Sequence, residues 1–157
     1  MKRRTFLATS VAALATPAFA GKEGVTYEVT RSEAEWRAML TDAEFAVMRE
    51  EGTEPAFTLP LNDETRKGTF HCKGCDQALY ASETKFKSGT GWPSFYDNIP
   101  GAIGTKKDRK LLFSVRTKCH CSRCGSHLGH IFDDGPEPTG KRHCINGVSL
   151  TFTPASA

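Results

Sequence analysis

Two short amphipathic segments follow residue 30. Apolar side chains recur at helical spacing directly behind two polar tetrapeptides, Ser32–Glu35 and Thr41–Glu44. Each tetrapeptide is a capping box, in which a Ser or Thr side chain and a Glu three residues later satisfy the free amides of a helix N-terminus. The pattern predicts two short helices, the second ending by Gly52, and then a turn-rich loop over residues 55–67.

From Gly68 onward the pattern changes to short apolar or alternating runs separated by glycine and proline. We expect strands around residues 69–71, 78–80, 111–115 and 144–152. Several short strands joined by tight turns predict a mainly β (α+β) domain, with antiparallel strands in a strongly bent sheet or a small barrel and short helices at its N-terminus.

The first twenty residues have the pattern of an export signal. A basic start, Lys2–Arg4, precedes a short apolar run, Phe6–Ala15, and a small-residue cleavage site, Ala18–Ala20. The paired arginines of Arg3–Leu7 favour the twin-arginine route, and an ordinary Sec signal is the alternative. The run is too short to anchor the chain in a bilayer. We therefore expect a periplasmic domain of residues 21–157 that has no stable membrane anchor.

The net charge of the expected mature domain differs from that of the whole chain. The chain has 21 basic and 18 acidic residues, and three of the basic residues lie in the signal. The remaining 18 basic and 18 acidic residues balance, so the sequence predicts no electrostatic surface for nucleic acid. A single domain of this size has a modest core, which a metal ion would help to stabilise.

Four of the six cysteines form two CxxC units, Cys72 with Cys75 and Cys121 with Cys124. Two such pairs are typical of a structural zinc site with four thiolate ligands, and a glycine lies within or directly after each unit, where a tight turn is needed. The unusually long spacing between the units predicts a site that joins two distant hairpins. Two alternatives stay open at this point, a thioredoxin-type redox pair and disulfide cross-links in an oxidising compartment.

Cys144 lies in a stretch whose strand alternation places Arg142, Cys144 and Asn146 on one face. A neighbouring guanidinium favours the thiolate and is expected to lower the pKa of the cysteine. Asn146 could donate a hydrogen bond to a thiolate or to a bound polar group. The alternative is a buried structural cysteine beside an arginine in a surface ion pair.

Four sequence motifs occur in a fixed order along the chain. After the first CxxC unit come Ser88–Phe95 (SGTGWPSF), Cys121–Pro136 (CSRCGSHLGHIFDDGP) and Arg142–Asn146 (RHCIN). This order resembles the B-type methionine sulfoxide reductases, which reduce the R epimer of methionine sulfoxide, and the resemblance runs from about Tyr27 to Phe152. It implies two antiparallel sheets rolled into a barrel-like body and a structural Zn²⁺ ion on the four CxxC cysteines.

The resemblance also implies roles for individual residues. Cys144 is the expected nucleophile, Trp92 is expected to contact the substrate methyl group, and His127 lies close by with a less defined substrate-binding role. The other expected active-site residues are His130, Asp134, Arg142 and Asn146.

The implied chemistry is an attack of the Cys144 thiolate on the sulfoxide sulfur. His130, assisted by Asn146, is expected to deliver a proton to the departing oxygen, while Asp134 orients or charges that donor. Methionine leaves and Cys144 becomes a sulfenic acid, which a second thiol must reduce. The expected partners are oxidised proteins and a thioredoxin-like reductant, with the enzyme itself a monomer.

One position departs from the family pattern. Thr90 stands where many relatives carry the cysteine that resolves the sulfenic acid. Cys119 is the only thiol left, so either a Cys119–Cys144 disulfide forms or an external thiol reduces Cys144 directly. Two other functions stay open on the residues alone: a non-catalytic zinc-ribbon binding module, and a periplasmic thiol–disulfide protein that uses one CxxC pair.

Overall fold

The computed structural model describes residues 25–111 and 114–156, with the side chains of 109–111 and 114–115 left out of the description. The predicted export signal, residues 1–20, lies outside this range. Within it, none of the helices has the length and apolar character needed to cross a membrane.

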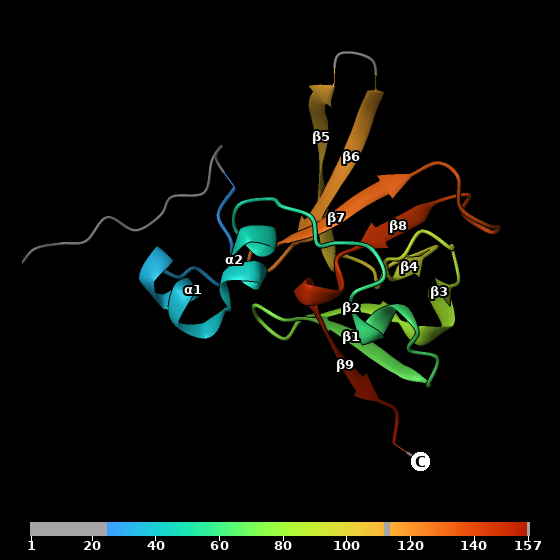
Figure 1. Cartoon of the computed structure of the whole chain (residues 1–157), viewed down its shortest axis with the longest axis horizontal. Coiled ribbons are helices and arrows are strands. Elements are labelled where there is room, and N and C mark those ends of the chain that lie inside the picture. Colours follow the sequence, from blue (N-terminus) through green and yellow to red (C-terminus); the bar gives the residue numbers. More distant parts are fainter. Residues whose placement is uncertain (1–24, 112–113, 157) are drawn as a thin grey trace, which may run out of the picture.

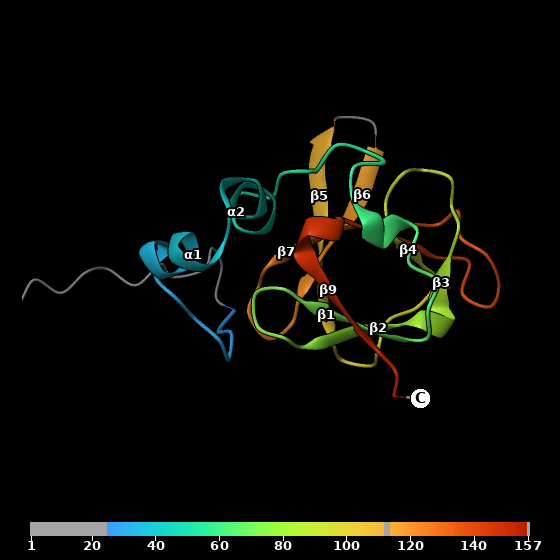
Figure 2. The ribbon, with the colours of Figure 1, turned by 60° about the horizontal axis from the view of Figure 1, so that its bottom comes forward.

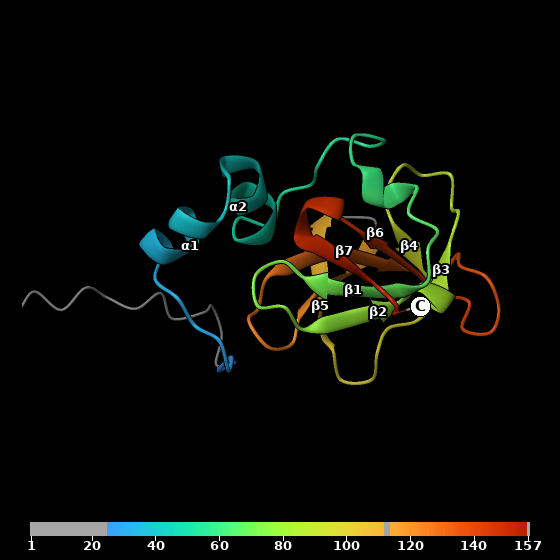
Figure 3. The same ribbon diagram turned by 90° about the horizontal axis from the view of Figure 1, so that it is seen from below.

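Two short helices form as the capping boxes predict, α1 (Glu33–Met39) and α2 (Asp42–Met48). In each, the Ser or Thr side chain accepts from the amide three residues on, and the Glu side chain accepts from the capping residue's own amide. Both helices bury apolar side chains, Trp36 on α1 and Phe45 and Met48 on α2. They lie to one side of the β structure in all three ribbon views (Figures 1, 2 and 3).

The strands form two antiparallel sheets (Figure 1). The three-stranded sheet has the order β2-β1-β9, from β1 (Gly68–Cys72), β2 (Ala78–Ala81) and β9 (Leu150–Pro154). The six-stranded sheet has the order β3-β4-β8-β7-β6-β5, from β3 (Lys85–Phe86), β4 (Ser94–Phe95), β5 (Ile103–Leu111), β6 (Ser114–Cys121), β7 (His127–Phe132) and β8 (Arg142–Ile145). Three short 3₁₀ helices complete the elements: η1 (Pro60–Asn62), η2 (Ser82–Thr84) and η3 (Gly147–Ser149).

The core lies between the two sheets, and aromatic side chains connect them. Phe95 of β4 stacks on Tyr80 of β2 at 4.2 Å between ring centroids and meets Phe70 of β1 edge-on at 5.0 Å. All three side chains are buried. The mainly β class with two antiparallel sheets is confirmed, but the expected barrel-like body is not found, because the two sheets of the described residues stay separate and do not close on themselves.

Two predicted strands are wrong in their bounds. The run 111–115 straddles the junction between β5 and β6, of which 112–113 lie outside the described residues. The run 144–152 is split into β8, η3 and β9, and its two strands belong to different sheets. Where the chain leaves the six-stranded sheet, the buried Glu54 carboxylate accepts from the amides of Gly147 and Val148, so these amides are paired outside any strand.

Candidate active site and metal centre

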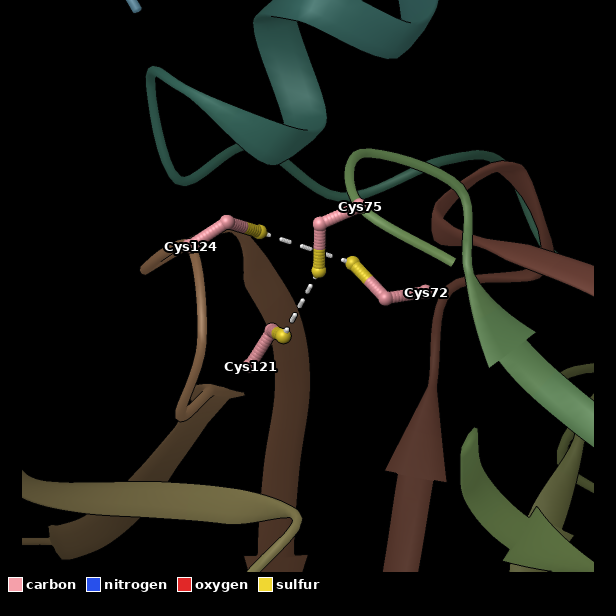
Figure 4. Close-up of side chains that lie close together, drawn as sticks. All are labelled: Cys72, Cys75, Cys121 and Cys124. Carbon is pink, nitrogen blue, oxygen red and sulfur yellow. Dashed lines mark hydrogen bonds between the residues drawn. The ribbon is translucent and has the colours of Figure 1, made fainter. Parts of the chain in front are cut away.

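Four cysteines converge where the turn after β1 meets the turn after β6 (Figure 4). Their sulfur atoms all lie within 4.8 Å of one another, and close pairs are Cys72 with Cys124 at 3.6 Å and Cys75 with Cys121 at 3.5 Å. A tetrahedral zinc ion with Zn–S bonds of about 2.3 Å needs neighbouring sulfurs about 3.8 Å apart. The four residues could therefore hold one metal ion.

The arrangement of the four sulfurs disfavours both a thioredoxin-type redox pair and disulfide cross-links. Both close pairs join one CxxC unit to the other, and their separations far exceed the roughly 2.05 Å of a disulfide bond. Because β1 belongs to the three-stranded sheet and β6 to the six-stranded sheet, the cluster connects the two sheets. Gly125, at φ +70°, makes the second turn, and the Tyr27 ring occupies the space that a Cβ would need.

Cys144 lies near the middle of the six-stranded sheet, on β8 between β4 and β7. It is directly opposite Ser94 on one side and His130 on the other. Residues that face each other across antiparallel strands point to the same side of the sheet, so Cys144 and His130 share a face. Gly129 allows β7 to approach β8 here, since a Cβ at that position would lie 2.0 Å from the Cys144 carbonyl oxygen.

A pocket of about 140 Å³ opens at Cys144. Its wall combines the apolar rings of a tryptophan and a phenylalanine with an arginine, a histidine, a cysteine and an amide, which suits a ligand with one apolar and one polar end. The lining residues are Thr53, Trp92, Arg116, Gly129, His130, Phe132, Cys144 and Asn146. The structure thus brings Trp92, His130, Cys144 and Asn146 together as the sequence predicts.

The electrostatics of Cys144 differ from the expectation. Burial raises the pKa of the thiol above its ordinary value, while the Arg142 guanidinium and the Thr90 hydroxyl, 4.0 Å from the sulfur, act in the opposite direction. The sign of the arginine's effect is as expected, but the loss of hydration outweighs it. Burial and Arg142 therefore act on the pKa of the Cys144 thiol in opposite directions, and burial is the larger influence.

Arg142 holds Asp134 rather than leaving it for the histidine. Its Nε and Nη2 donate to the two carboxylate oxygens of Asp134 at 2.9 and 2.8 Å, and its guanidinium lies 4.5 Å from the Phe132 ring centre. The pair lowers the pKa of the Asp134 carboxyl. Both carboxylate oxygens of Asp134 are thus bound by Arg142, and the expected role of Asp134 toward His130 stays a prediction.

The carboxylate beside His130 is Asp108, on β5. His130 Nε2 lies 3.4 Å from Asp108 Oδ2, at the edge of hydrogen-bond range and without the alignment of a full bond. Burial and the charge of Arg116 lower the pKa of His130, and the carboxylate opposes them. Asp108 is only 5% exposed. No local motif marks Asp108 as a site residue, and only the alternation along a β5–β6 hairpin could have indicated it.

Asp108 belongs to an ion-pair network in which only its own side chain and that of Lys118 are buried. Arg116, its cross-strand partner, donates to its Oδ2 at 3.1 Å, and Lys118 Nζ lies 3.8 Å from its Oδ1. Lys118 also donates to Glu51 at 2.6 Å, and Glu51 binds Lys106 as well. Although burial opposes them, these contacts lower the pKa of Glu51 to about 2. The network therefore places fixed charges behind His130.

His127 is adjacent to the pocket but does not line it. Its ring meets the His130 ring edge-on at 5.5 Å, and the residue is 3% exposed. It borders a second cavity of about 290 Å³, together with Lys106, Lys118 and Glu51. Burial is the main cause that lowers the pKa of His127 to about 4, so it is neutral at physiological pH. His127 thus contacts His130, and its expected role in substrate binding stays a prediction.

The backbone of Glu54 connects two pocket residues, Asn146 and Trp92, and no sequence motif predicts this role. Its backbone amide donates to Asn146 Oδ1 at 3.0 Å, and its carbonyl accepts from Trp92 Nε1 at 3.2 Å. Asn146 Nδ2 donates to the Leu128 carbonyl at 2.9 Å, so the Asn146 side chain is held by backbone at both ends. Asn146 therefore has a positioning role in addition to the predicted assistance to His130.

Cys119 lies on the other face of the sheet. It pairs with Gly129, which in turn pairs with Ile145, whereas Lys118 pairs with His130 and His130 with Cys144. Cys119 is 0% exposed, and burial raises the pKa of its thiol to about 12. A disulfide between Cys119 and Cys144 would have to pass through the sheet. Of the two routes expected for the sulfenic acid, this placement favours reduction by an external thiol, and the role of Cys119 stays a prediction.

Comparison with known proteins agrees with this geometry. A family model described as the SelR domain matches residues 40–154. The chain is similar to a protein named peptide methionine sulfoxide reductase MsrB from Methanosarcina barkeri, with 52% identity over 124 residues, 79% of this chain and 87% of the relative. It is similar to proteins of the same name from Methanosarcina mazei, at 49% over 80% of this chain and 90% of the relative, and Agrobacterium fabrum, at 47% over 81% and 94%.

Proposed function

The chain belongs to the MsrB family of peptide methionine sulfoxide reductases, and from this premise we propose that Cys144 reduces the R epimer of methionine sulfoxide in oxidised proteins. The observation that carries the proposal is the register of β7 and β8. It places Cys144 directly opposite His130, in a pocket that Trp92 also lines. Nucleophile, proton donor and apolar wall thus meet at one small cavity.

The pocket accounts for each part of the substrate. The methyl group packs on Trp92 and Phe132, while the sulfoxide oxygen faces His130. The Cys144 sulfur bonds to the sulfoxide sulfur, and His130 donates a proton to the oxygen as the negative charge develops there. Asp108 stabilises the protonated histidine, and Asn146 and Glu54 hold the wall in place.

The hydroxyl then passes from the methionine sulfur to the Cys144 sulfur as the bond between the two sulfurs breaks. One thiol and one sulfoxide give one thioether and one sulfenic acid, so Cys144 is oxidised as methionine is formed. Two external thiols then return Cys144 to the thiol, with release of water and one disulfide. Because Cys119 is buried on the opposite face, we propose that a thioredoxin-like dithiol attacks the Cys144 sulfenic acid directly.

We further propose that the four-cysteine cluster binds one structural Zn²⁺. Thiolate ligands in a tetrahedral set are the preferred donors of zinc, and four of them leave no position for substrate. Bound zinc would supply no chemistry to the reaction, and it would hold the two sheets together.

Export is proposed on the sequence alone. We propose that the segment of residues 1–20 directs the protein to the periplasm by the twin-arginine route. Replacing Arg3 and Arg4 together with lysine should then retain the precursor in the cytoplasm, as measured by cell fractionation. Unchanged periplasmic recovery of the lysine variant would argue for the Sec route.

The decisive experiment is a pair of matched cysteine variants. Cys144→Ser should abolish the loss of R-sulfoxide from a synthetic peptide, with metal content and circular dichroism unchanged. Cys119→Ser should keep the wild-type rate with a dithiol reductant, because its thiol takes no part in turnover. Full activity of Cys144→Ser would refute the assignment, and inactive but folded Cys119→Ser would restore Cys119 as the resolving thiol.

A further inference from the structure

Phe57 is the most exposed of the large apolar side chains in the described part of the chain, at 69%. An aromatic ring in water gives up the favourable free energy that burial would provide. A single exposed ring is common on protein surfaces, so its position in the fold and its backbone conformation carry the argument.

The backbone of Phe57 is strained. Its φ is +62°, a left-handed conformation that glycine adopts readily and a bulky residue rarely does. The conformation is held by a hydrogen bond from the Phe57 amide to the Gly91 carbonyl at 2.8 Å, and by the Thr58 hydroxyl, which donates to the Pro55 carbonyl at 2.8 Å. The turn thus keeps a phenylalanine where glycine would be more favourable.

This turn brings the ring beside the reactive cysteine. The Phe57 ring lies against Gly91, where an added Cβ would come within 2.7 Å of it. Gly91 is flanked by Thr90, whose hydroxyl is 4.0 Å from the Cys144 sulfur, and by Trp92 in the pocket wall. Phe57 itself does not line the pocket among the described residues. Phe57 is thus connected to the site through Gly91, the chain neighbour of the pocket residue Trp92.

We propose that Phe57 is a docking surface for the apolar side chain that neighbours an oxidised methionine in an unfolded polypeptide. This inference rests on the proposed function and adds a preference among its substrates. A pocket of about 140 Å³ holds one side chain, so the flanking residues of a polypeptide must lie on the rim. The first exposed apolar surface they meet beyond Gly91 is the Phe57 ring.

The test compares peptides that differ only beside the methionine-R-sulfoxide, with leucine in one and serine in the other. Phe57→Gly suits the left-handed turn and removes only the ring. We expect kcat/KM for the leucine peptide to fall by about three- to tenfold, mainly through KM, the range of one aromatic contact. The serine peptide and free methionine sulfoxide should be unaffected. Met39→Ala removes an exposed apolar group on α1 and should leave all substrates unchanged.

Two outcomes would overturn the inference: an equal loss on all substrates, which indicates a purely structural ring, and no loss at all. A wild-type dimer that Phe57→Gly converts to a monomer with unchanged kinetics would assign the ring to a second copy of the chain instead. Phe57→Asn, which also tolerates left-handed φ, repeats the test if the glycine variant does not fold. Wild-type enzyme inactive on every sulfoxide would refute the proposed function itself, whatever the variants do.

Discussion

Glu54 provides the most direct test of how the pocket is held. Its carboxylate accepts from the Gly147 amide at 2.7 Å and from the Val148 amide at 2.8 Å, and the residue is 6% exposed. Glu54→Ala removes both acceptors at once. Glu54→Gln keeps the shape of the side chain, but its amide group can accept from only one of the two backbone groups.

The expected magnitudes follow from these contacts. A buried donor without an acceptor costs about 1 to 3 kcal/mol, and Val148 is only half-buried, so water can reach its amide. Glu54→Ala should therefore lower the free energy of unfolding by about 2 to 4 kcal/mol. Burial raises the pKa of the Glu54 carboxyl, which shows that the charge is costly to desolvate. Glu54→Gln relieves part of that cost, and its loss should be about 1 to 2 kcal/mol.

The Glu54 variants should also lose activity under conditions in which they are fully folded. The Gly147 turn directly follows Asn146, and the Glu54 backbone holds both Asn146 and Trp92. We expect kcat/KM of Glu54→Gln to fall by about tenfold or more at a temperature where the variant is fully folded.

The assays are urea unfolding and steady-state kinetics on one peptide sulfoxide. Glu50→Gln, which removes an exposed carboxylate 3.6 Å from Arg37, is the matched control and should change both quantities little. A Glu54→Gln variant as stable and as active as wild type would refute the argument.

Three further predictions concern charge and metal. Arg142→Met should shift the pH dependence of Cys144 alkylation by iodoacetamide to higher pH, because the guanidinium lowers the pKa of the thiol; an unchanged or downward shift contradicts this. Asp108→Asn should lower kcat by about 10²-fold and move the loss of activity with rising pH to lower pH, because the carboxylate raises the pKa of His130; kcat retained with an unmoved profile would exclude the pairing. Cys72→Ser should lose stoichiometric zinc and unfold at a lower temperature than wild type, measured by metal analysis and calorimetry; full zinc retention would show that the cluster is not the metal site.

Local patterns were sufficient for much of the fold. Each capping box involves groups three residues apart, and both helices begin where the boxes predict. The CxxC units are local in the same sense, since one tight turn brings each pair of sulfurs together. Alternation around Cys144 also held within β8, where Arg142 and Cys144 are half-buried and His143 and Ile145 are buried.

The strand predicted from this alternation ends at β8, and the contacts that follow it involve a residue distant in the sequence. Residues 144–152 alternate well enough for one strand, but Glu54, some 90 residues earlier, binds the amides that a strand would have paired. A contact made from such a distance in the sequence leaves no local signal. The break therefore could not be read from the pattern.

By itself, the sequence determined the residue types of the candidate site: the proposed nucleophile Cys144, the four cluster cysteines, and the histidine and tryptophan of the pocket. Only the tertiary structure decided which partner each one has. Sheet register placed Asp108 rather than Asp134 beside His130, and it placed Cys119 on the face away from Cys144. The physical reason is that a shift of one residue in register reverses every side chain, and register is decided by the packing of the whole sheet.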